Sequence, residues 1–345
     1  MRRIGVLTSG GDAPGMNAAV MAVAKAARYN GMTLVGIKRG YNGALNIEQN
    51  GMAELDLDTV LDIADQPGTY LRTARCLEFL QPEMQQQAAK NIRDMGIEGV
   101  IVIGGDGSFK GAQALCNLGV PCIGIPGTID NDLPYTEMTL GYDSAVNSCV
   151  EAIRAIRATS RSHDRPAVVE VMGRHCGDIA LKAAAGTGAE ICIVPEVEWS
   201  IPAVADRLSL LIAEGNPRAT VVIAEGAFDA MQEYDWKTVL REHNLPVHDD
   251  DKISTRFLTR VLRCLTGCEA RTTVLGYIQR GRQPSAYDSW FAFEAGNLAV
   301  NLLRNGIGNQ VIGIKDGRVY YMPISMALKQ KREFNLSLYN MINSL

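Results

Sequence analysis

The chain alternates short, almost uninterrupted apolar runs with longer stretches of helical periodicity. Strands that are apolar on both faces are typical of parallel sheets covered by helices on each side. The pattern therefore predicts an α/β protein with mainly parallel, doubly wound sheets, whose ligands bind outside the carboxyl ends of the strands. The predicted strands lie at 3–9, 33–38, 99–105, 121–127, 167–172, 190–196, 219–225, 271–277 and 310–315.

This series supplies more strands than one compact sheet usually holds, so two domains are expected within the 345 residues. Residues 226–254 interrupt the alternation with a polar, irregular stretch, which is expected to form a surface excursion. The last stretch, KQKREFNLSLYNMINSL, is expected to pack either on its own subunit or on a neighbour.

Composition excludes several classes of protein. The 34 basic and 38 acidic side chains give a net charge of −4, so no nucleic-acid or acidic-lipid partner is expected. No apolar run approaches the ~18 residues that span a bilayer, and no signal-peptide segment precedes the first strand. The eight cysteines are scattered among apolar residues, and only Cys264 and Cys268 lie close together. This pattern argues against disulfides and against metal ligation by cysteine. A cytoplasmic protein is therefore expected.

Two glycine-rich turns follow predicted strands and lead into predicted helices. The first is TSGGDAPGMN (8–17), and the second is IGGDGS (103–108). Glycine lets backbone N–H groups approach an anion closely, and the start of a helix adds the positive end of its dipole. The first turn has neither the spacing of the dinucleotide fingerprint nor that of the Walker loop. Both turns are predicted to bind phosphate; for the first, the alternative is a purely structural turn.

Three carboxylates accompany these turns. Asp106 lies in the second turn, where its charge would oppose a bare phosphate, so a bound Mg²⁺ is predicted between them. The alternative is that Asp106 only caps the following helix. Asp130 and Asp132 end the stretch IGIPGTIDND (123–132), just after another predicted strand. Asp130 could there accept the proton of a substrate hydroxyl, whereas an Asx turn that closes a loop is the alternative.

Five motifs taken together resemble a known family. LTSGGDAPGMN, IGGDGS, PGTIDND, VEVMGR and GYIQRG occur in the order and spacing of the bacterial ATP-dependent 6-phosphofructokinases, over residues 3 to about 320. The resemblance implies a cleft between an ATP- and Mg²⁺-binding domain (1–141 plus 279–328) and a domain that binds fructose 6-phosphate (142–278 plus 329–345). It implies transfer of a phosphoryl group from MgATP to O1 of fructose 6-phosphate, giving fructose 1,6-bisphosphate and ADP in glycolysis.

The resemblance also implies roles for individual donor-site residues. Asp130 matches the general base, Asp132 its companion carboxylate and Asp106 the magnesium residue. Arg75 would stabilise the charge that develops between donor and acceptor, as a guanidinium does strongly in a water-poor cleft. Thr128 would add a hydroxyl contact. The remaining residues that the resemblance implies at the ATP site are Gly11, which offers its backbone amide to the transferring group, Cys76, Gly105, Gly107 and Ser108.

The sugar phosphate is expected to bind in the second half of the chain. The residues that match fructose-contacting and 6-phosphate-binding positions are Arg165, Met172, Gly173, Arg174, Glu225, Arg271, Tyr277 and Arg280. Arginine suits phosphate because its planar fork binds two oxygens at once. In the family the equivalents of Arg165 and Arg271 reach in from a neighbouring subunit, so the resemblance implies a homotetramer.

Four positions bear on the choice of substrate. Gly107 and Gly127 match ATP users of the family, whereas pyrophosphate users carry Asp and Lys there. Tyr277 replaces the family's histidine and Arg282 its last glycine, which leaves sugar affinity and sugar choice open. A pyrophosphate-dependent phosphofructokinase and a catalytically silent, sugar-phosphate-binding regulatory subunit are the alternatives. A dinucleotide-dependent oxidoreductase would fit the fold but lacks the GxGxxG spacing.

Overall fold

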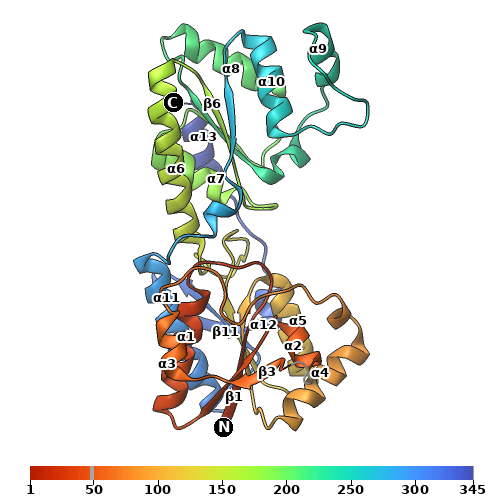
Figure 1. Ribbon diagram of the computed structural model, residues 1–345, viewed down its shortest axis with the longest axis vertical. Coiled ribbons are helices and arrows are strands. Elements are labelled where there is room, and N and C mark those ends of the chain that lie inside the picture. The colour runs from red at the N-terminus through yellow and green to blue at the C-terminus, as the bar shows by residue number, and fades with distance from the viewer. Residues whose placement is uncertain (47–49, 345) are drawn as a thin grey trace. The chain divides into compact units, whose positions relative to one another are not determined.

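The computed structural model describes residues 1–46 and 50–344 (Figure 1). The chain falls into two compact units, one formed by Met1–Ala145 with Arg280–Glu333 and the other by Val146–Gln279 with Phe334–Leu345. Each unit is built on a sheet whose central strands are parallel. The α/β class that was predicted from the alternation of apolar runs and helical stretches is confirmed.

The sheet of the first unit has the order β11-β10-β5-β4-β1-β2-β3, in which only the two edge strands are antiparallel to their neighbours. Both edge strands were missed by the sequence analysis because they are short or alternate polar with apolar residues. The strands of this sheet are β1 (Arg3–Thr8), β2 (Thr33–Ile37), β3 (Met52–Glu54), β4 (Val100–Gly104), β5 (Cys122–Pro126), β10 (Gln310–Lys315) and β11 (Arg318–Pro323).

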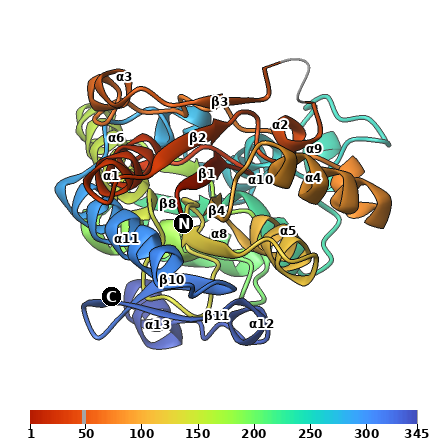
Figure 2. The same ribbon diagram turned by 90° about the horizontal axis from the view of Figure 1, so that it is seen from below.

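Helices cover both faces of this sheet, as Figures 1 and 2 show. One face carries α1 (Met16–Tyr29), α3 (Leu57–Asp62) and α11 (Ala286–Arg304). The other face carries α2 (Tyr41–Leu45), α4 (Pro82–Asp94), α5 (Asp106–Asn117), α12 (Ile324–Ala327) and the short η2 (Glu78–Leu80). Helices α1 and α11 pack closely because their interface is made of small residues: a Cβ added to Gly296 would lie 2.6 Å from the Cβ of Ala22. The helices on the two sides together bury both faces of the apolar strands.

The second unit holds a parallel sheet of order β7-β8-β6-β9. Its strands are β6 (Ala167–Val171), β7 (Ile191–Ile193), β8 (Thr220–Ala224) and β9 (Arg271–Val274). Its helical segments are α6 (Tyr142–His163), which begins in the first unit, α7 (Asp178–Thr187), α8 (Ile201–Ala213), η3 (Glu225–Ala230), α9 (Trp236–Glu242), α10 (Thr255–Thr266), η4 (Gly276–Gln279) and α13 (Leu336–Ser344). Among the described residues, no helix combines the length and the apolar character that crossing a membrane requires.

The C-terminal helix packs on its own chain. The Asn343 side chain accepts a hydrogen bond from the backbone N–H of Cys192 (2.9 Å) and donates one to the Cys192 carbonyl (3.2 Å). Strand β7 lies at an edge of its sheet, so α13 satisfies backbone groups that would otherwise face solvent there. Of the two alternatives for this segment, the first therefore holds.

The expectation that residues 226–254 are irregular is wrong for part of the segment. It contains the end of η3 and the whole of α9, whose Trp236 and Leu240 are buried. The Asp235 side chain caps α9 by accepting a hydrogen bond from the Thr238 N–H (3.2 Å). Two apolar residues at i and i+4 are enough to anchor one helical turn, but they are too few to stand out in a polar stretch.

A buried carboxylate joins the starts of two helices in the first unit. Asp288, in the first turn of α11, accepts hydrogen bonds from the Gly141 N–H (2.8 Å), the Ser144 N–H (2.9 Å) and the Ser144 hydroxyl (2.5 Å). Burial raises the pKa of Asp288 to about 6, against these hydrogen bonds, which favour the charged form. The folded protein therefore holds the Asp288 proton more tightly than the unfolded chain does.

This pKa predicts a pH-dependent stability. The raised pKa of Asp288 adds to the free energy of unfolding. This stabilisation is fully present below pH ~4 and is lost as the pH rises through about 6. Urea unfolding of the wild type and of Asp288→Asn should show it, because the constant cost of the substitution cancels in the pH dependence. The difference in unfolding free energy is expected to fall by up to about 3 kcal/mol between pH 4 and 7. A difference that stays constant over this range would contradict the raised pKa.

Candidate functional site

Three turns meet at one edge of the sheet in the first unit. Strands β1, β4 and β5 are parallel neighbours, so their carboxyl ends lie together. The N–H of Ser9 donates to the carbonyl of Ile103 (2.9 Å), and the N–H of Gly127 donates to the carbonyl of Gly104 (2.9 Å). The turns that follow β1 and β5 are thus each bonded to the end of β4. The glycine-rich motifs that were predicted to bind phosphate are brought together by this register.

Glycine is needed at this junction for close backbone approach. A Cβ on Gly104 would lie 2.6 Å from the carbonyl oxygen of Ser9, and Gly10 has a φ of 92°. Either position would be strained with any other residue. A Cβ on Gly105 would lie 3.9 Å from the Cβ of Thr128, so the second and third turns are in contact distance as well.

A guanidinium lies directly on the first turn. Arg280 donates from Nη1 to the carbonyl of Asp12 (2.6 Å), and a Cβ on Gly11 would come within 3.0 Å of the same nitrogen. The structure therefore places Arg280 with the glycine turn of the first unit. Sequence reasoning had grouped Arg280 with the sugar-phosphate residues and did not anticipate this contact.

The segment that carries Arg75 and Cys76 is tied to the same turn. The Thr73 hydroxyl donates to the carbonyl of Gly10 (2.7 Å), and the Thr8 hydroxyl donates to the carbonyl of Arg72 (2.9 Å). Arg75 lies just beyond these bonds in the sequence. The segment that leads to Arg75 therefore lies beside the first turn.

Asp106 begins helix α5 and is paired with a lysine one turn later. Its Oδ2 lies 2.6 Å from Nζ of Lys110, and its side chain is 46% exposed. The i, i+4 spacing of Asp and Lys could have revealed this pair in the sequence. The carbonyl of the buried Ser108 accepts a hydrogen bond from the Tyr41 hydroxyl (2.5 Å), which holds the first turn of α5 in place. A Cβ on Gly107 would meet no atom within 4 Å, so this side of the turn is open.

The third turn is held by the residue between its two acids. Asn131 has a φ of 51°, accepts a hydrogen bond from the Thr139 N–H (3.0 Å) and donates one to the Glu137 carbonyl (3.3 Å). The Asp130 N–H donates to the Thr128 hydroxyl (3.2 Å). Asn131 was missed by sequence reasoning, although asparagine is among the few residues that adopt this conformation readily.

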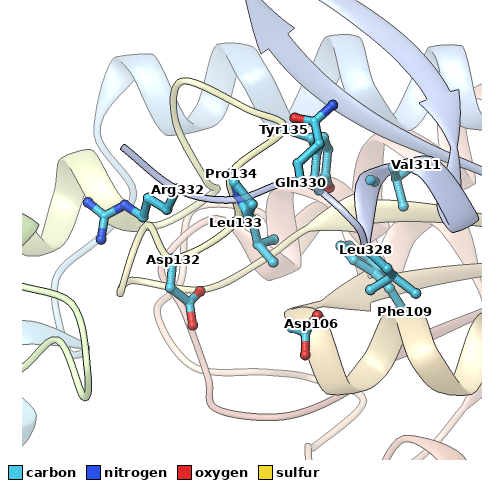
Figure 3. A pocket seen from close by; sticks show the side chains of 11 residues that line it. Asp106, Phe109, Asp132, Leu133, Pro134, Tyr135, Val311, Leu328, Gln330 and Arg332 are labelled. Atoms are coloured by element: carbon cyan, nitrogen blue, oxygen red, sulfur yellow. The ribbon is translucent and has the colours of Figure 1, made fainter. Parts of the chain in front are cut away.

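Asp106 and Asp132 line one cavity of about 250 Å³ (Figure 3). In that view both carboxylates lie along its lower margin, whereas the side chains of Phe109, Leu133 and Val311 form apolar walls. Acids from the second and third turns thus share one hollow. Arg332 lines the same cavity, so its guanidinium offsets part of this negative charge, and a bound metal ion would offset more of it.

In the second unit, predicted sugar-binding residues follow three neighbouring strands. Met172, Gly173 and Arg174 come directly after β6, Glu225 follows β8, and Tyr277 lies just beyond β9. The Arg174 N–H donates to the Glu225 carboxylate (2.9 Å), so the first two loops are in direct contact. The parallel sheet brings all of these loops to one edge. Tyr277 is open to solvent, with 82% of its surface exposed.

Two positions admit only glycine, one in the turn after β6 and one in the loop after β8. A Cβ on Gly173, whose φ is 138°, would lie 2.2 Å from the carbonyl oxygen of Cys176, and one on Gly226 would lie 1.9 Å from that of Arg174. The fully buried Gln279 supports the same turn by accepting a hydrogen bond from the Met172 N–H (3.0 Å). Gln279 belongs to the GYIQRG motif, but sequence reasoning assigned it no role.

Arg165 and Arg271 lie at the opposite end of this sheet. Arg271 is the first residue of β9, and Arg165 precedes β6 by two positions. Nη2 atoms of Arg165 and Arg271 lie 2.7 Å and 3.9 Å from the same oxygen, Oε2 of Glu269. Because a strand rises ~3.3 Å per residue, these guanidinium groups are separated from the loops after β6 and β8 by the length of the strands. Within one chain, the second unit does not bring them together with Met172 or Glu225.

Comparisons with known proteins agree with this arrangement. The family model described as phosphofructokinase matches residues 3–303. The ATP-dependent 6-phosphofructokinase 1 of Clostridium perfringens is 44% identical over 349 residues, which cover 100% of this chain and 99% of that protein. The ATP-dependent 6-phosphofructokinase of Clostridium acetobutylicum is also 44% identical, with the same coverage.

Solved structures extend the likeness to the fold. Phosphofructokinase from Saccharomyces cerevisiae has a TM-score of 0.82 and 31% identity; the match covers 95% of this chain and 45% of the yeast chain, so this chain spans under half the length of that relative. A pyrophosphate-dependent phosphofructokinase from Marinobacter aquaeolei has a TM-score of 0.81 at 20% identity, covering 98% of this chain and 86% of its own. At that identity the likeness concerns the fold alone.

Proposed function

Because the chain belongs to the phosphofructokinase family, we propose that it is an ATP-dependent 6-phosphofructokinase. It transfers the terminal phosphoryl group of ATP to O1 of fructose 6-phosphate and yields fructose 1,6-bisphosphate and ADP. The observation that carries this proposal is the 44% identity, over essentially the whole of both chains, with a relative named for that activity. The convergence of three turns at the ends of β1, β4 and β5 supports it independently.

The proposed chemistry assigns a proton acceptor and positive charges to the first unit. Asp130 removes the proton from the attacking O1 hydroxyl, with Asp132 and the Thr128 hydroxyl beside it on the same turn. Arg75 stabilises the negative charge that develops on the transferring group, a role supported by the hydrogen bonds that tie the neighbouring residues Arg72 and Thr73 to the first turn. Backbone amides contact the phosphates of ATP at the glycine turns and at the start of α5, a helix N-terminus that favours anions. The residues proposed for this contact are Gly11, Gly105, Gly107 and Ser108, with Cys76 beside the nucleotide.

The proposal includes Mg²⁺ at Asp106. Mg²⁺ is usually held by one or two carboxylates together with water and substrate phosphates, and Asp106 with Asp132 on one cavity fits that pattern. Among the residues that the structure describes, no three His, Cys, Asp or Glu side chains gather around one point. When bound, the ion would neutralise phosphate charge. Lys110, which is paired with Asp106, would then share or release that carboxylate.

The sugar phosphate is proposed to bind at the loops of the second unit. Glu225 accepts hydrogen bonds from sugar hydroxyls. Met172, Gly173 and Arg174 form one wall of the sugar site, and the hydrogen bond from the Arg174 N–H to Glu225 holds this wall beside Glu225. Tyr277 donates a hydrogen bond but carries no positive charge, so arginines must supply the charge that holds the 6-phosphate. For this role we propose Arg165, Arg271 and Arg280.

Arg165 and Arg271 lead to a proposed homotetramer. Both lie at the start of their strands, whereas the other sugar-binding residues of the second unit follow theirs. If Arg165 and Arg271 bind the same sugar phosphate as the residues that follow the strands, they must come from a second copy of the chain. Glu269 holds the two guanidinium groups side by side, in the arrangement that a neighbour's phosphate would bind. We further propose a cytoplasmic location, in keeping with eight free cysteines.

The packing around two glycines favours ATP over pyrophosphate as the donor. A Cβ on Gly127 would lie 2.9 Å from Cε of Met16 and 3.0 Å from Cγ2 of Ile103. The lysine of pyrophosphate users would therefore have to displace the core beneath it. Gly107 faces open space, which leaves room for a nucleoside.

A coupled assay with purified protein tests the proposed function and the donor together. With fructose 6-phosphate as acceptor, MgATP should give turnover and pyrophosphate should not. Gly107→Asp should lower kcat/KM for MgATP at least ~10-fold, because its carboxylate repels the donor phosphates. Gly107→Ala is the matched control, since a Cβ meets nothing there, and should stay near the wild-type rate. Faster turnover with pyrophosphate would establish the alternative enzyme, and no turnover with either donor would favour a regulatory subunit.

A further inference from the structure

One buried amide side chain lies between three segments of the second unit. Gln279 is the last residue of η4 and is fully buried. Its Oε1 accepts hydrogen bonds from the N–H of Met172 (3.0 Å) and from the thiol of Cys149 (3.1 Å). Its Nε2 donates a hydrogen bond to the carbonyl of Gly276 (2.9 Å). The side chain thus joins the loop after β6, helix α6 and the loop after β9.

These three hydrogen bonds require the two different ends of an amide. The backbone N–H of Met172 donates and the carbonyl of Gly276 accepts, so the oxygen and the nitrogen of Gln279 must face them in this order. Burial raises the pKa of the Cys149 thiol to about 12, so the thiol keeps its proton and acts as a donor. An apolar side chain of the same length would leave the Met172 N–H and the Gly276 carbonyl without these partners.

Two of the three partners open loops that carry proposed sugar-binding residues. Strands β6 and β9 are parallel neighbours, and the N–H of Leu275 donates to the carbonyl of Glu170 (3.0 Å) just beyond their paired residues. The next residue of the β9 loop is Gly276, with a φ of 52°, and the exposed Tyr277 follows it. Gln279 therefore bridges the two loops where they leave the edge of the sheet.

The loop after β6 is held on its other side by a residue of a different kind. The exposed Glu225 accepts a hydrogen bond from the Arg174 N–H (2.9 Å), two residues beyond Met172. Glu225 is open to a ligand, whereas Gln279 has no accessible surface with which to touch one. Any effect of Gln279 on the sugar must therefore pass through the residues that it holds.

We propose that Gln279 is a positioning residue, which fixes the spacing of the loops after β6 and β9 and thereby sets the affinity for the sugar phosphate. The inference rests on the proposed function, because it takes fructose 6-phosphate as the ligand. Contact residues that are held in place before the ligand arrives bind it more tightly, since less binding energy is used to order the loops. Loss of the bridge should therefore raise the KM for fructose 6-phosphate and leave kcat at saturating sugar nearly unchanged.

The variant Gln279→Met keeps the length of the side chain and removes its hydrogen bonds. It should raise the KM for fructose 6-phosphate ~10-fold, and the dissociation constant measured by calorimetry without ATP should rise by the same factor. Both kcat and the KM for MgATP should stay within ~2-fold of the wild type. A mere loss of stability would instead lower the amount of active protein and hence kcat. Gln232→Met, at an exposed glutamine of the same unit, is the matched control and should leave all constants unchanged.

The variant Gln279→Glu separates hydrogen bonding from packing. Its protonated carboxyl group can accept from Met172 and donate to Gly276 as the amide does, whereas the ionised form has no proton to donate and buries a charge. Burial favours the protonated form. The ratio of its KM for fructose 6-phosphate to that of the wild type should therefore stay within ~3-fold at pH 6 and rise toward pH 9. A ratio near one over the whole range would equally show that the neutral carboxyl replaces the amide.

Three results would overturn the role of Gln279. They are an unchanged KM in Gln279→Met, a fall in its kcat without a rise in KM, and a raised KM in Gln279→Glu that does not depend on pH. If Gln279→Met does not fold, Cys149→Ala and Cys149→Ser replace it. Alanine removes one donor to Oε1 and should raise the KM ~3-fold, whereas serine keeps a donor and should stay near the wild type. Equal constants for these two variants would count against the proposal.

The wild-type measurements distinguish a failure of this inference from a failure of the proposed function. If the wild type neither binds nor phosphorylates fructose 6-phosphate, both fall. If the wild type does both and Gln279→Met matches it, only the role of Gln279 is wrong. The calorimetric titration needs no turnover, so it tests the positioning of the loops even in a protein that binds the sugar without phosphorylating it.

Discussion

Replacement of Asp130 by serine is expected to lower kcat about 10²–10⁴-fold while the KM for fructose 6-phosphate changes little. A general base acts in the transition state, so its loss slows the chemical step without weakening the ground-state complex. The local structure should survive, because Asn131 makes the hydrogen bonds that hold this turn. Initial rates at varied fructose 6-phosphate, with saturating MgATP, measure both constants.

Two companion measurements make the Asp130 result decisive. Asp130→Asn keeps the shape of the side chain but cannot accept the proton, and it should lose as much kcat as the serine variant. Circular dichroism and the thermal midpoint should match the wild type in both. A kcat within ~3-fold of the wild type in either variant would remove Asp130 from the reaction and with it the proposed mechanism.

Combining two impaired variants in one oligomer is expected to restore activity at low sugar concentration if neighbouring chains complete each sugar site. Arg271→Ser alone should raise the KM for fructose 6-phosphate roughly 10–100-fold, since a charge-assisted phosphate contact is lost. In hybrids with Asp130→Ser chains, some sites combine an intact Asp130 with a neighbour's intact Arg271. Random assembly of equal amounts should return up to about a quarter of the wild-type rate at low sugar concentration.

The hybrid experiment requires co-expression of the two tagged chains, followed by isolation of oligomers that carry both tags. A double variant, Asp130→Ser/Arg271→Ser, mixed with wild type is the matched control, because there no new intact combination arises beyond those of the wild-type chains. If hybrids of the two single variants are no more active than the average of their parents, then Arg271 serves its own chain, and the homotetrameric clamp is wrong.

Local patterns in the sequence were sufficient for the α/β class and for the turns that carry the site. Apolar runs identify buried parallel strands, and glycine pairs at their ends identify where backbone amides are exposed, because both signals depend on near neighbours. Convergence of the turns after β1, β4 and β5 then follows from parallel register. Edge strands β3 and β11 and helix α9 escaped notice, since short, half-exposed elements carry few apolar residues.

By itself, then, the sequence determined the class of the fold, the three turns and the residue types of a phosphoryl-transfer site. Only the tertiary structure decided that Arg280 lies on the turn of Gly11 and that Gln279 supports Met172. The reason is physical: these contacts join residues far apart along the chain, so they depend on packing and register rather than on any local periodicity. The residues adjacent to a side chain in the sequence do not indicate which residues contact it across the edge of a sheet.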